Sequence, residues 1–443
     1  MRDWLKREPV VIVDGKGAVL RDTRGRAFID ANASIWTNLH GHRHPKIDAA
    51  VKRQLGKIAH SSALGLANVP ASQLAEKLIQ AAGPPFRRVF FSDDGSTAVE
   101  AALKMAHQFA QRTHPGREPK FLALGGAYHG DTIGAVSLGH IDLFHHAYRG
   151  LLFKSDHVPP PYCYRCPFNR AKPERADARE YRRCNWECVG QLEQKFAAQK
   201  KKSRPYAAFV VEPLMQGAAG MIPQPEGWLR RTAALTRDHG ALLIADEVMT
   251  GFGRSGPIFA CQKENVRPDL MALAKGMSGG YLPMAATLAT QKIFDAFLGR
   301  YEDFKTFFHG HSYTANQLGA AASLASLELL QSASCRSARR DLEKVLRAEL
   351  NSLWALSAVG DIRQVGTMAG VELVKNWKTR ERFDPRQRVG GRVCEALARR
   401  GVLTRPIGDV IVLLPPYCTA PAQVRRTVAA LHQSVVEVCG KFI

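Results

Sequence analysis

The apolar segment ALLIADEV, residues 241–248, gives the clearest structural signal in this chain. It places Asp246 at the end of a strand pattern, and 275 − 246 = 29 residues later a second apolar segment, DLMALAK, ends in Lys275. Short apolar runs of this kind are typical of strands that are buried on both faces of a parallel sheet. The carboxyl ends of parallel strands meet at one edge, where open α/β folds bind their ligands. We therefore expect Asp246 and Lys275 to lie together at such an edge.

The same alternation of apolar runs and helical patterns continues outward from these two segments. Further strands are predicted at RVFFS (88–92), FLALGG (121–126) and AAFVVEP (207–213), and helices at residues 97–113 and 228–239. Strands that alternate with helices along the chain indicate crossover connections. The predicted fold class is therefore α/β, with a mainly parallel central sheet covered by helices on both faces.

The two ends of the chain predict a second, smaller α+β domain. Turn residues between short apolar runs indicate strands over residues 10–30, and strand and helix patterns are mixed again toward the C-terminus. We predict that residues 1–45 and 318–443 form the small domain and that residues 46–317 form the large, ligand-binding domain. Residues 157–187, rich in proline and then in cysteine and arginine, predict a loop-like insertion in the large domain.

The composition is that of a globular protein with an unusual charge. Of 443 residues, 45% are hydrophobic and 23% are charged, which excludes disordered and fibrous classes. A net charge of +22 favours anionic partners. The first ten residues, MRDWLKREPV, lack the apolar core of a secretory signal, and no apolar run approaches the roughly 20 residues of a membrane span. We expect a cytoplasmic protein whose nine cysteines are mostly reduced.

A carboxylate and an amine at one sheet edge suit the cofactor pyridoxal 5'-phosphate. A lysine forms a Schiff base with the aldehyde of this cofactor, and an aspartate pairs with its pyridinium nitrogen. Taken alone, Asp246 would serve equally well as a turn cap and Lys275 as a solvated surface residue. That interpretation loses weight because Lys275 ends an apolar run, and glycines at positions 276, 279 and 280 leave room around its amine.

Two further loops supply the other groups that this cofactor needs. Gly95 and Ser96 lie between RVFFS and a helical pattern, so they open a helix N-terminus that suits a phosphate dianion. Tyr128 follows FLALGG and would place an aromatic ring on the face of the pyridine. Each loop follows a predicted strand, which favours one pyridoxal phosphate site at the sheet edge.

A glycine motif points to a different cofactor. Gly251, Gly253 and Gly256 spell GxGxxG, the pattern of dinucleotide-binding loops. Residues 246–250 separate these glycines from their strand, and Pro257 interrupts the expected start of a helix. We therefore expect the glycines to shape the loop after Asp246 and not to bind a nicotinamide cofactor.

The insertion and the residue that follows it contain four cysteines in the order CxxC and CxxxC, at Cys163, Cys166, Cys184 and Cys188. Thiolates at such spacing are able to hold a structural zinc ion, and four free thiols in a reducing compartment are the alternative. In either case we expect no metal in the chemistry.

The basic residues keep open a second class of function, a nucleic-acid-binding protein. They are scattered along the chain and over helix faces and do not gather in one tail or stripe. We expect a solvated basic surface and no specific nucleic-acid partner.

Together, the motifs resemble one enzyme family. Over nearly the whole chain, and in family order, they are similar to the class III aminotransferases of the fold type I pyridoxal phosphate superfamily. The resemblance implies a pyridoxal phosphate-dependent transaminase with ping-pong transfer between small-molecule substrates, and a homodimer with shared active sites. Six segments carry it: DDGSTAVEAALKMA (93–106), GAYHGDT (126–132), VVEPLMQGAAGM (210–221), LLIADEVMTGFGRSG (242–256), LMALAKGMSGG (270–280) and FHGHSYTANQLG (308–319).

The resemblance also implies roles for individual residues. Lys275 would be the Schiff-base lysine and proton shuttle, Asp246 would keep the ring nitrogen protonated, and Tyr128 would stack on the ring. Gly95 and Ser96 would hold the phosphate. The remaining implied contacts are His311 and Ser312 from the partner subunit, and Trp36, Tyr128, Gly310 and Arg405 at the substrate, with Arg405 on a carboxylate. The active-site loops also contain Glu212, Gln216 and Arg254, to which no role is assigned.

Within the family, four segments resemble the members that serve biotin synthesis: ASIWTNLHGHRHP (33–45), FGRSGPIFAC (252–261), GHSYTANQLG (310–319) and RPIGDVIVLLPPY (405–417). This closer resemblance implies S-adenosylmethionine as amino donor and 8-amino-7-oxononanoate as acceptor. An ω-amino acid:pyruvate, diamine or lysine-dependent aminotransferase is the alternative within the family.

Three departures from the pattern bear on the substrate. Ile35 precedes Trp36 where paired aromatic residues are common, and Val412 stands where some members carry a tyrosine. The aromatic segment that usually precedes the N-terminal strands is missing before RDWLKREPV. We expect either a substrate wall of different shape or a start that lies further upstream.

Overall fold

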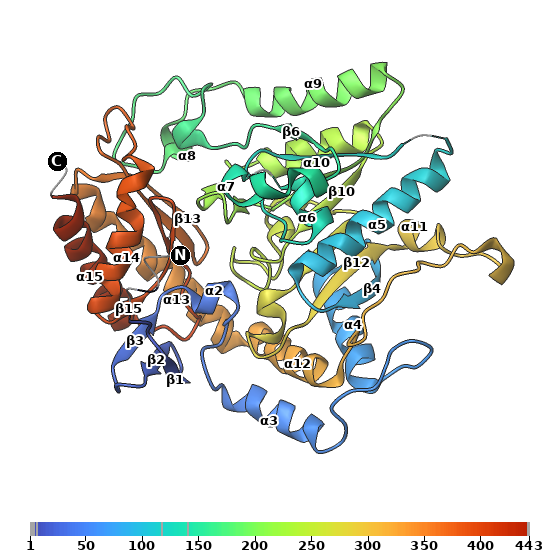
Figure 1. The fold of residues 1–443 in the computed structure, drawn as a ribbon, viewed down its shortest axis with the longest axis horizontal. Helices are drawn as coiled ribbons and strands as arrows, with labels where there is room; N and C mark the ends of the chain where they lie inside the picture. The colour runs from blue at the N-terminus through green and yellow to red at the C-terminus, as the bar shows by residue number, and fades with distance from the viewer. Residues whose placement is uncertain (1–4, 6–7, 117, 140, 441–443) are drawn as a thin grey trace.

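The computed structural model describes Leu5 and residues 8–116, 118–139 and 141–440 (Figure 1). The expectation about the segment before the first strand concerns residues outside this part. Within the described residues, seven strands form the central sheet, in the order β4-β12-β11-β10-β7-β5-β6. Their bounds are β4 Phe86–Ser92, β12 Ala285–Thr290, β11 Leu270–Leu273, β10 Leu242–Asp246, β7 Tyr206–Val211, β5 Lys120–Leu124 and β6 Asp156–Val158.

The central sheet is mainly parallel, as predicted. β10 runs parallel to both β11 and β7, and β5 runs parallel to β7 and β6. β12 is the exception, because it pairs antiparallel with β11 and with β4. The sequence of β12, AATLAT, lacks the large β-branched and aromatic residues that mark a strand, so the sequence pattern predicts no strand there.

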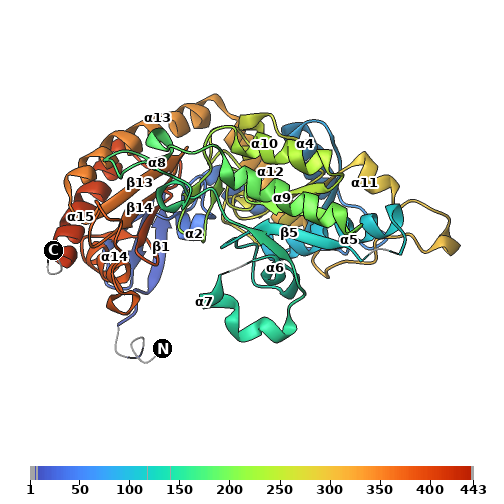
Figure 2. The ribbon, with the colours of Figure 1, turned by 90° about the horizontal axis from the view of Figure 1, so that it is seen from above.

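Alternate residues of each strand face opposite helical layers. Leu243 and Ala245 of β10 join the cluster that contains helices α9 (Glu187–Lys201) and α10 (Trp228–Asp238). Leu242 and Ile244 join the cluster built around α5 (Gly95–Thr113). Figure 2 shows these helices on the two sides of the sheet. Burial on both faces explains why β10 is a continuous apolar run and not an alternating pattern.

The smaller part contains two four-stranded sheets among the described residues. In the first, the N-terminal strands pair with a strand from near the C-terminus, because Ile29 stands opposite Val402 in parallel register. The first sheet comprises β1 Ile12–Lys16, β2 Val19–Asp22, β3 Ala27–Asp30 and β15 Val402–Leu403. The second comprises β13 Val359–Val365, β14 Met368–Leu373, β17 Val410–Leu413 and β16 Pro406–Ile407.

Helices cover this smaller part. They are α13 Ala333–Leu350, α14 Val389–Arg399 and α15 Pro421–Cys439. α15 lies at its outer end in Figure 1, and α13 lies along its edge in Figure 2. The two ends of the chain thus share one small α+β unit, although the domain boundaries at residues 45 and 317 stay predictions. The helix that begins at the second boundary, α12 (Gln317–Gln331), packs on α3 (Pro45–Leu55) and α4 (Val69–Ala82) as well as on α13.

The insertion contains little regular structure and is fastened to the small unit. It includes the short helix α8 (Ala178–Tyr181), and Arg165 bonds Glu372 of β14 at 2.6 Å. The remaining short elements are α2 Ala33–Trp36, α6 Ile133–Leu138, α7 Asp142–His145, β8 Met215–Gln216, β9 Ile222–Pro223 and α11 Gln291–Asp295. None of the helices in the described part of the chain is both long and apolar enough to cross a membrane.

Candidate active site

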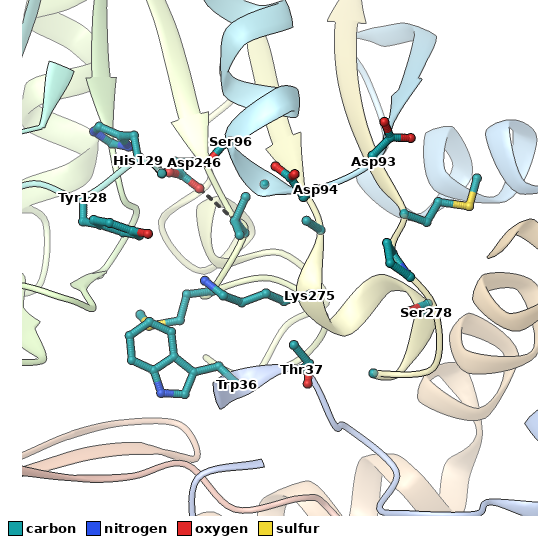
Figure 3. Close-up of a pocket in the computed structure, with 18 of the residues that line it drawn as sticks. Trp36, Thr37, Asp93, Asp94, Ser96, Tyr128, His129, Asp246, Lys275 and Ser278 are labelled. Carbon is teal, nitrogen blue, oxygen red and sulfur yellow. Dashed lines mark hydrogen bonds and ion pairs between the residues drawn. The ribbon is translucent and has the colours of Figure 1, made fainter. Parts of the chain in front are cut away.

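A cavity of about 440 Å³ lies at the carboxyl edge of the central sheet (Figure 3). β10 and β11 are parallel, and Asp246 stands opposite Ala272, so both strands end at the same edge. Asp246 and Lys275 therefore reach one cavity, although they are far apart in the sequence. Of the residues predicted from the sequence, the cavity lining includes Trp36, Gly95, Ser96, Tyr128, Asp246 and Lys275.

Asp246 is buried and bonds to a buried histidine. Its Oδ2 lies 2.8 Å from Nδ1 of His129, and its Oδ1 accepts the backbone N–H of Val248 at 3.0 Å. Burial disfavours the imidazolium form of His129, but the hydrogen bond to Asp246 and the charge of that carboxylate outweigh burial and raise its pKa. The His129 ring thus serves as a hydrogen-bond donor to the Asp246 carboxylate, which lines the cavity. His129 belongs to the motif GAYHGDT, but the sequence predicts no role for it.

Lys275 lies deep in the same cavity, at the start of a short 3-10 turn with φ of 41°. Burial lowers the pKa of its amine, an effect that Asp246 and Glu212 oppose and that the positive charge of Arg405 adds to. Its Nζ lies 4.9 Å from the centre of the Trp36 ring, and Figure 3 shows the lysine between that ring and the side of the cavity that carries Tyr128. A lowered pKa increases the neutral fraction, which is the nucleophilic form of the amine.

Trp36 is presented by a left-handed turn. The four consecutive residues of α2 have φ between 45° and 73°, and none of them is glycine. This conformation costs roughly 1–2 kcal/mol per residue for L-amino acids, so the surroundings must impose it. Asp30 accepts the backbone N–H and the hydroxyl of Ser34, and the Arg254 guanidinium donates to the Trp36 carbonyl at 3.4 Å. These hydrogen bonds hold the strained turn in place and therefore keep Trp36 over Lys275.

The N-terminus of α5 opens onto the cavity through Gly95 and Ser96. Asp94 caps the helix by accepting the backbone N–H of Thr97. A Cβ on Gly95 would lie 2.7 Å from a methyl carbon of Val248, so glycine is required for this close approach. The hydroxyl of Ser96 accepts the backbone N–H of Asp131 at 3.0 Å. The arrangement presents backbone N–H groups and the positive end of the helix dipole to an anion.

Tyr128 and Glu212 form a further part of the cavity lining. Burial, together with the hydrogen bond from its hydroxyl to Asp131 at 2.7 Å, raises the pKa of Tyr128. Burial raises the pKa of Glu212 to about 7, and its carboxylate accepts the backbone N–H groups of Tyr128 and Gly217. Asp131, which accepts the hydrogen bond from Tyr128, is not among the site residues predicted from the sequence. Its position in the motif YHGD was the available signal.

Four predicted site residues lie outside the cavity lining. Arg405 is exposed between β15 and β16, although its charge acts on both Lys275 and Tyr128. Gly310 and Ser312 are exposed, and the Ser312 carbonyl accepts from His60 at 2.9 Å. His311 Nδ1 lies 3.2 Å from the carboxylate of Asp93, a lining residue. Within one chain, these four residues form no part of the cavity surface.

The residues present fit pyridoxal phosphate. The cavity offers a buried amine, a buried carboxylate with a proton donor behind it, an aromatic side chain and an open helix N-terminus. The phosphate cradle is also sterically specific, because a Cβ on Gly95 would meet Val248 and one on Gly130 would overlap Ser96. This set of groups matches the cofactor's aldehyde, pyridinium nitrogen, ring face and phosphate in turn.

The dinucleotide motif and the cysteines contribute nothing to this cavity. Gly251, Gly253 and Gly256 form an irregular loop after β10, with the Gly251 N–H bonded to the Glu247 carbonyl, and no helix starts there in the described structure. The cysteines of the CxxC and CxxxC pairs, Cys163, Cys166, Cys184 and Cys188, are free thiols. Among the described residues, no group of three or more His, Cys, Asp or Glu side chains is arranged to hold a metal ion.

Comparison with known proteins agrees with this geometry. The family model for class III aminotransferases matches residues 3–435. The adenosylmethionine-8-amino-7-oxononanoate aminotransferase of Geobacter sulfurreducens is 46% identical over 440 residues, 99% of this chain and 95% of that protein. The protein of the same name from Nitratidesulfovibrio vulgaris is 47% identical over 440 residues, 99% of this chain and 79% of that protein.

Solved structures are similar over the same extent. The crystal structure of adenosylmethionine-8-amino-7-oxononanoate aminotransferase from Methanocaldococcus jannaschii superposes with a TM-score of 0.91 at 37% identity, covering 99% of this chain and 95% of that one. An amine transaminase from an uncultivated Pseudomonas species, solved in its PLP-bound form, gives a TM-score of 0.90 at 33% identity, covering 98% and 96%.

Proposed function

This chain belongs to the class III aminotransferases, and from that premise we propose that it transfers the amino group of S-adenosylmethionine to 8-amino-7-oxononanoate, giving 7,8-diaminononanoate for biotin synthesis. The relatives named for this reaction, similar over 99% of the chain, support the choice of substrates. The observation that carries the mechanism is the pair of side chains, Asp246 and Lys275, that line one cavity at the ends of two parallel strands. When bound, pyridoxal phosphate supplies a ring that withdraws electrons from the carbon bearing the transferred amino group.

Lys275 would hold the cofactor's aldehyde carbon through its amine and move the proton at the substrate carbon. Its lowered pKa keeps more of the amine neutral, so that Nζ is able both to bind and to accept a proton. The Trp36 ring, 4.9 Å from Nζ, excludes water from one side of the amine. One lysine would serve both halves of the transfer.

Asp246 would hold a proton at the ring nitrogen of the cofactor. His129, whose pKa is raised by the same carboxylate, stabilises the negative charge of Asp246 from behind. Gly95 and Ser96 would bind the phosphate at the N-terminus of α5, and Tyr128 would lie against the ring. Each of these residues lines the cavity, and their roles agree with the residue types that the cofactor requires.

The substrate would be held between Trp36 and residues that complete the site in a dimer. Arg405 would bind the carboxylate of the ketone substrate as a bidentate donor. Gly310, His311 and Ser312 lie on an exposed segment, which supports their contribution to the neighbouring site of a homodimer. Nine free thiols support a reducing compartment, so we place the reaction in the cytoplasm.

A second candidate is an aminotransferase with a different donor. The similarity to the amine transaminase, at 33% identity and a TM-score of 0.90, favours it, as do the departures from the family pattern at Ile35 and Val412, although neither residue lines the cavity. This candidate keeps Lys275, Asp246 and Tyr128 in the same roles. It changes only the molecule that supplies the amino group.

The absorption spectrum of the purified protein with pyridoxal phosphate separates these candidates. S-adenosylmethionine, L-lysine and β-alanine are added separately, and the visible band of the lysine-bound cofactor is followed. We expect S-adenosylmethionine alone to bleach the band. Bleaching by L-lysine or β-alanine without an effect of S-adenosylmethionine would contradict the proposed donor and favour the second candidate.

A further inference from the structure

A small basic pocket lies between α13 and the glycine loop that follows β10. Its volume is about 110 Å³, and its walls come from α13, from that loop and from the turn between β13 and β14. α13 runs along one edge of the molecule in Figure 2. The lining residues are Gly253, Gly256, Arg336, Arg339, Arg340, Glu343, Gly366 and Thr367. None of them lines the active-site cavity, so the two spaces are distinct.

Three arginines converge on this pocket from one face of α13. Arg336, Arg339 and Arg340 stand at positions i, i+3 and i+4, which are neighbours on a helix surface. Within the described residues, none of the three lies within 4.0 Å of a carboxylate. Like charges at this spacing destabilise a helix when nothing compensates them. The pocket therefore brings three positive charges together, with Glu343 as the acidic residue of its lining.

Arg339 is a built part of the pocket and not a surface side chain. It is 7% exposed, and its guanidinium donates to the Gly256 carbonyl at 3.1 Å. Its Nε has no hydrogen-bond acceptor among the residues that the structure describes, and the guanidinium lies beside the Cys335 thiol and 5.7 Å from the centre of the Tyr417 ring. A buried guanidinium N–H without an acceptor costs free energy that a bound anion would recover. The acidic member of the lining, Glu343, lies 3.6 Å from Arg347, which is not a lining residue.

The glycine loop provides the space. Gly253 and Gly256 have φ of 88° and 112°, a conformation that favours glycine. A Cβ on Gly253 would overlap the Arg339 guanidinium, whereas a Cβ on Gly256 would meet nothing within 4 Å. Gly253 thus allows Arg339 to pack against the loop. Gly253 and Gly256 belong to the GxGxxG motif and do not line the active-site cavity, but both line this pocket.

We propose that this pocket binds a phosphate-sized oxyanion, either free phosphate or the phosphate group of a small ester. Its volume suits one tetrahedral group and is too small for a nucleotide. Arg336 and Arg340 are exposed at its rim, so that an ester tail would project to solvent. Arginine presents several N–H donors in a fixed fork, which matches phosphate oxygens. Part of the +22 net charge would then serve anion binding.

Calorimetric titration of the enzyme loaded with pyridoxal phosphate tests this proposal. Inorganic phosphate and glycerol 3-phosphate are titrated separately, in a chloride buffer of low ionic strength. The loaded enzyme is used because the cofactor's own phosphate then occupies the N-terminus of α5. Repeating the titration with Arg405→Ala removes binding at the expected substrate arginine. We expect one ligand per chain in both proteins, and the tighter of the two ligands identifies free or esterified phosphate as the occupant.

Variants at the rim keep the test independent of folding. Because Arg336 and Arg340 are exposed, Arg336→Gln and Arg340→Gln should leave the melting temperature nearly unchanged and weaken phosphate binding roughly tenfold each. Arg425→Gln, exposed on α15 and outside the lining, is the matched control and should bind as the wild type does. Absence of binding at millimolar phosphate, or equal affinity in all variants, would overturn the proposal.

Discussion

His129 Nδ1 lies 2.8 Å from Asp246 Oδ2, and both side chains are almost completely buried. The aspartate ends β10, and the histidine belongs to the loop that follows β5, so the contact joins two strands separated by β7 in the sheet. The pair makes Asp246 a carboxylate with a permanent donor on its far side. Its other oxygen, Oδ1, accepts the backbone N–H of Val248, and the carboxylate lines the cavity in which the cofactor's ring nitrogen would lie.

Replacing Asp246 by Asn should reduce the rate of the donor half-reaction by about 10²–10⁴-fold, the usual contribution of a positioned acid or base. The amide cannot hold a proton at the ring nitrogen, and the pKa of His129 falls because its charged partner is lost. Stopped-flow absorbance measures the rate. Asp238→Asn, an exposed residue at the end of α10, should react like the wild type. Equal rates for wild type and Asp246→Asn would contradict the assignment.

Replacing Lys275 by Ala should abolish the visible band of the bound cofactor and reduce turnover by at least about a thousandfold. The amine is the group that would hold the aldehyde carbon, and Ala leaves the cavity without it. An absorption spectrum and a steady-state assay measure both effects. Lys52→Ala, an exposed position on α3, serves as the control. A Lys275→Ala protein that keeps the band would rule out the proposed attachment.

Replacing Arg405 by Ala should raise the KM for the ketone substrate more than tenfold, with a smaller effect on the donor half-reaction. The reason is that Arg405 would bind the carboxylate of the ketone substrate. Its effect on Lys275 is electrostatic, since its charge lowers the pKa of that amine. Separate single-turnover measurements of the two halves distinguish these effects. The control is Arg386→Ala, whose side chain is 90% exposed. An equal loss in both halves would argue against a carboxylate-binding role.

Glu247 should make the protein less stable as the pH rises. Burial raises the pKa of this carboxyl from 4.5 to about 7, although the N–H groups of Ala260 and Cys261 oppose the shift. The folded state therefore binds the proton more tightly than the unfolded state, and its stabilising contribution is complete below pH 4.5 and is lost as the pH rises through about 7. Thermal unfolding between pH 4.5 and 8 should show a flatter profile for Glu247→Gln than for the wild type.

The matched control for this pH effect is Glu76→Gln, an exposed position on α4. Its pH profile should follow that of the wild type. If Glu247→Gln also follows the wild type, another group carries the pH dependence in this range.

Replacing Ile35 by Gly should raise the free energy of unfolding by about 1 kcal/mol. Ile35 has φ of 62° and its side chain is 52% exposed, so the substitution relieves strain and removes little packing. Urea denaturation measures the change. Ile58→Gly is the contrasting case, because Ile58 is 47% exposed with no positive φ and should lose stability. A loss of stability in Ile35→Gly would show that the turn is not strained at this residue.

The sequence anticipated the sheet-edge groups because each is encoded by its own neighbours. Asp246 and Lys275 end apolar runs that are buried on both faces, and Gly95 and Ser96 open a helix that Asp94 caps. Tyr128 follows a strand in the same way. Burial periodicity and capping act within a few residues, so they remain visible without the fold. β12 escaped notice because its small residues give no such local signal.

Other features depend on contacts between residues that are distant in the chain. His129 and Asp246 lie 117 residues apart in the sequence, and no local pattern predicts their pairing. The pKa of Glu212 is raised by burial, which the local sequence does not indicate either. The left-handed turn at Trp36 contradicts local preference and persists because Asp30 and Arg254 hold it.

By itself, the sequence determined the α/β class, the family and the chemical types of the groups at the sheet edge, since these depend on residue type and short-range order. Only the tertiary structure decided which of these groups meet, how far their pKa values shift and where uncompensated charge collects. The arginines of α13 show this division: their helical spacing is local, but the glycine loop that converts them into a pocket lies 83 residues away at Gly256. Desolvation and long-range packing set these properties, and both arise only when the chain is folded.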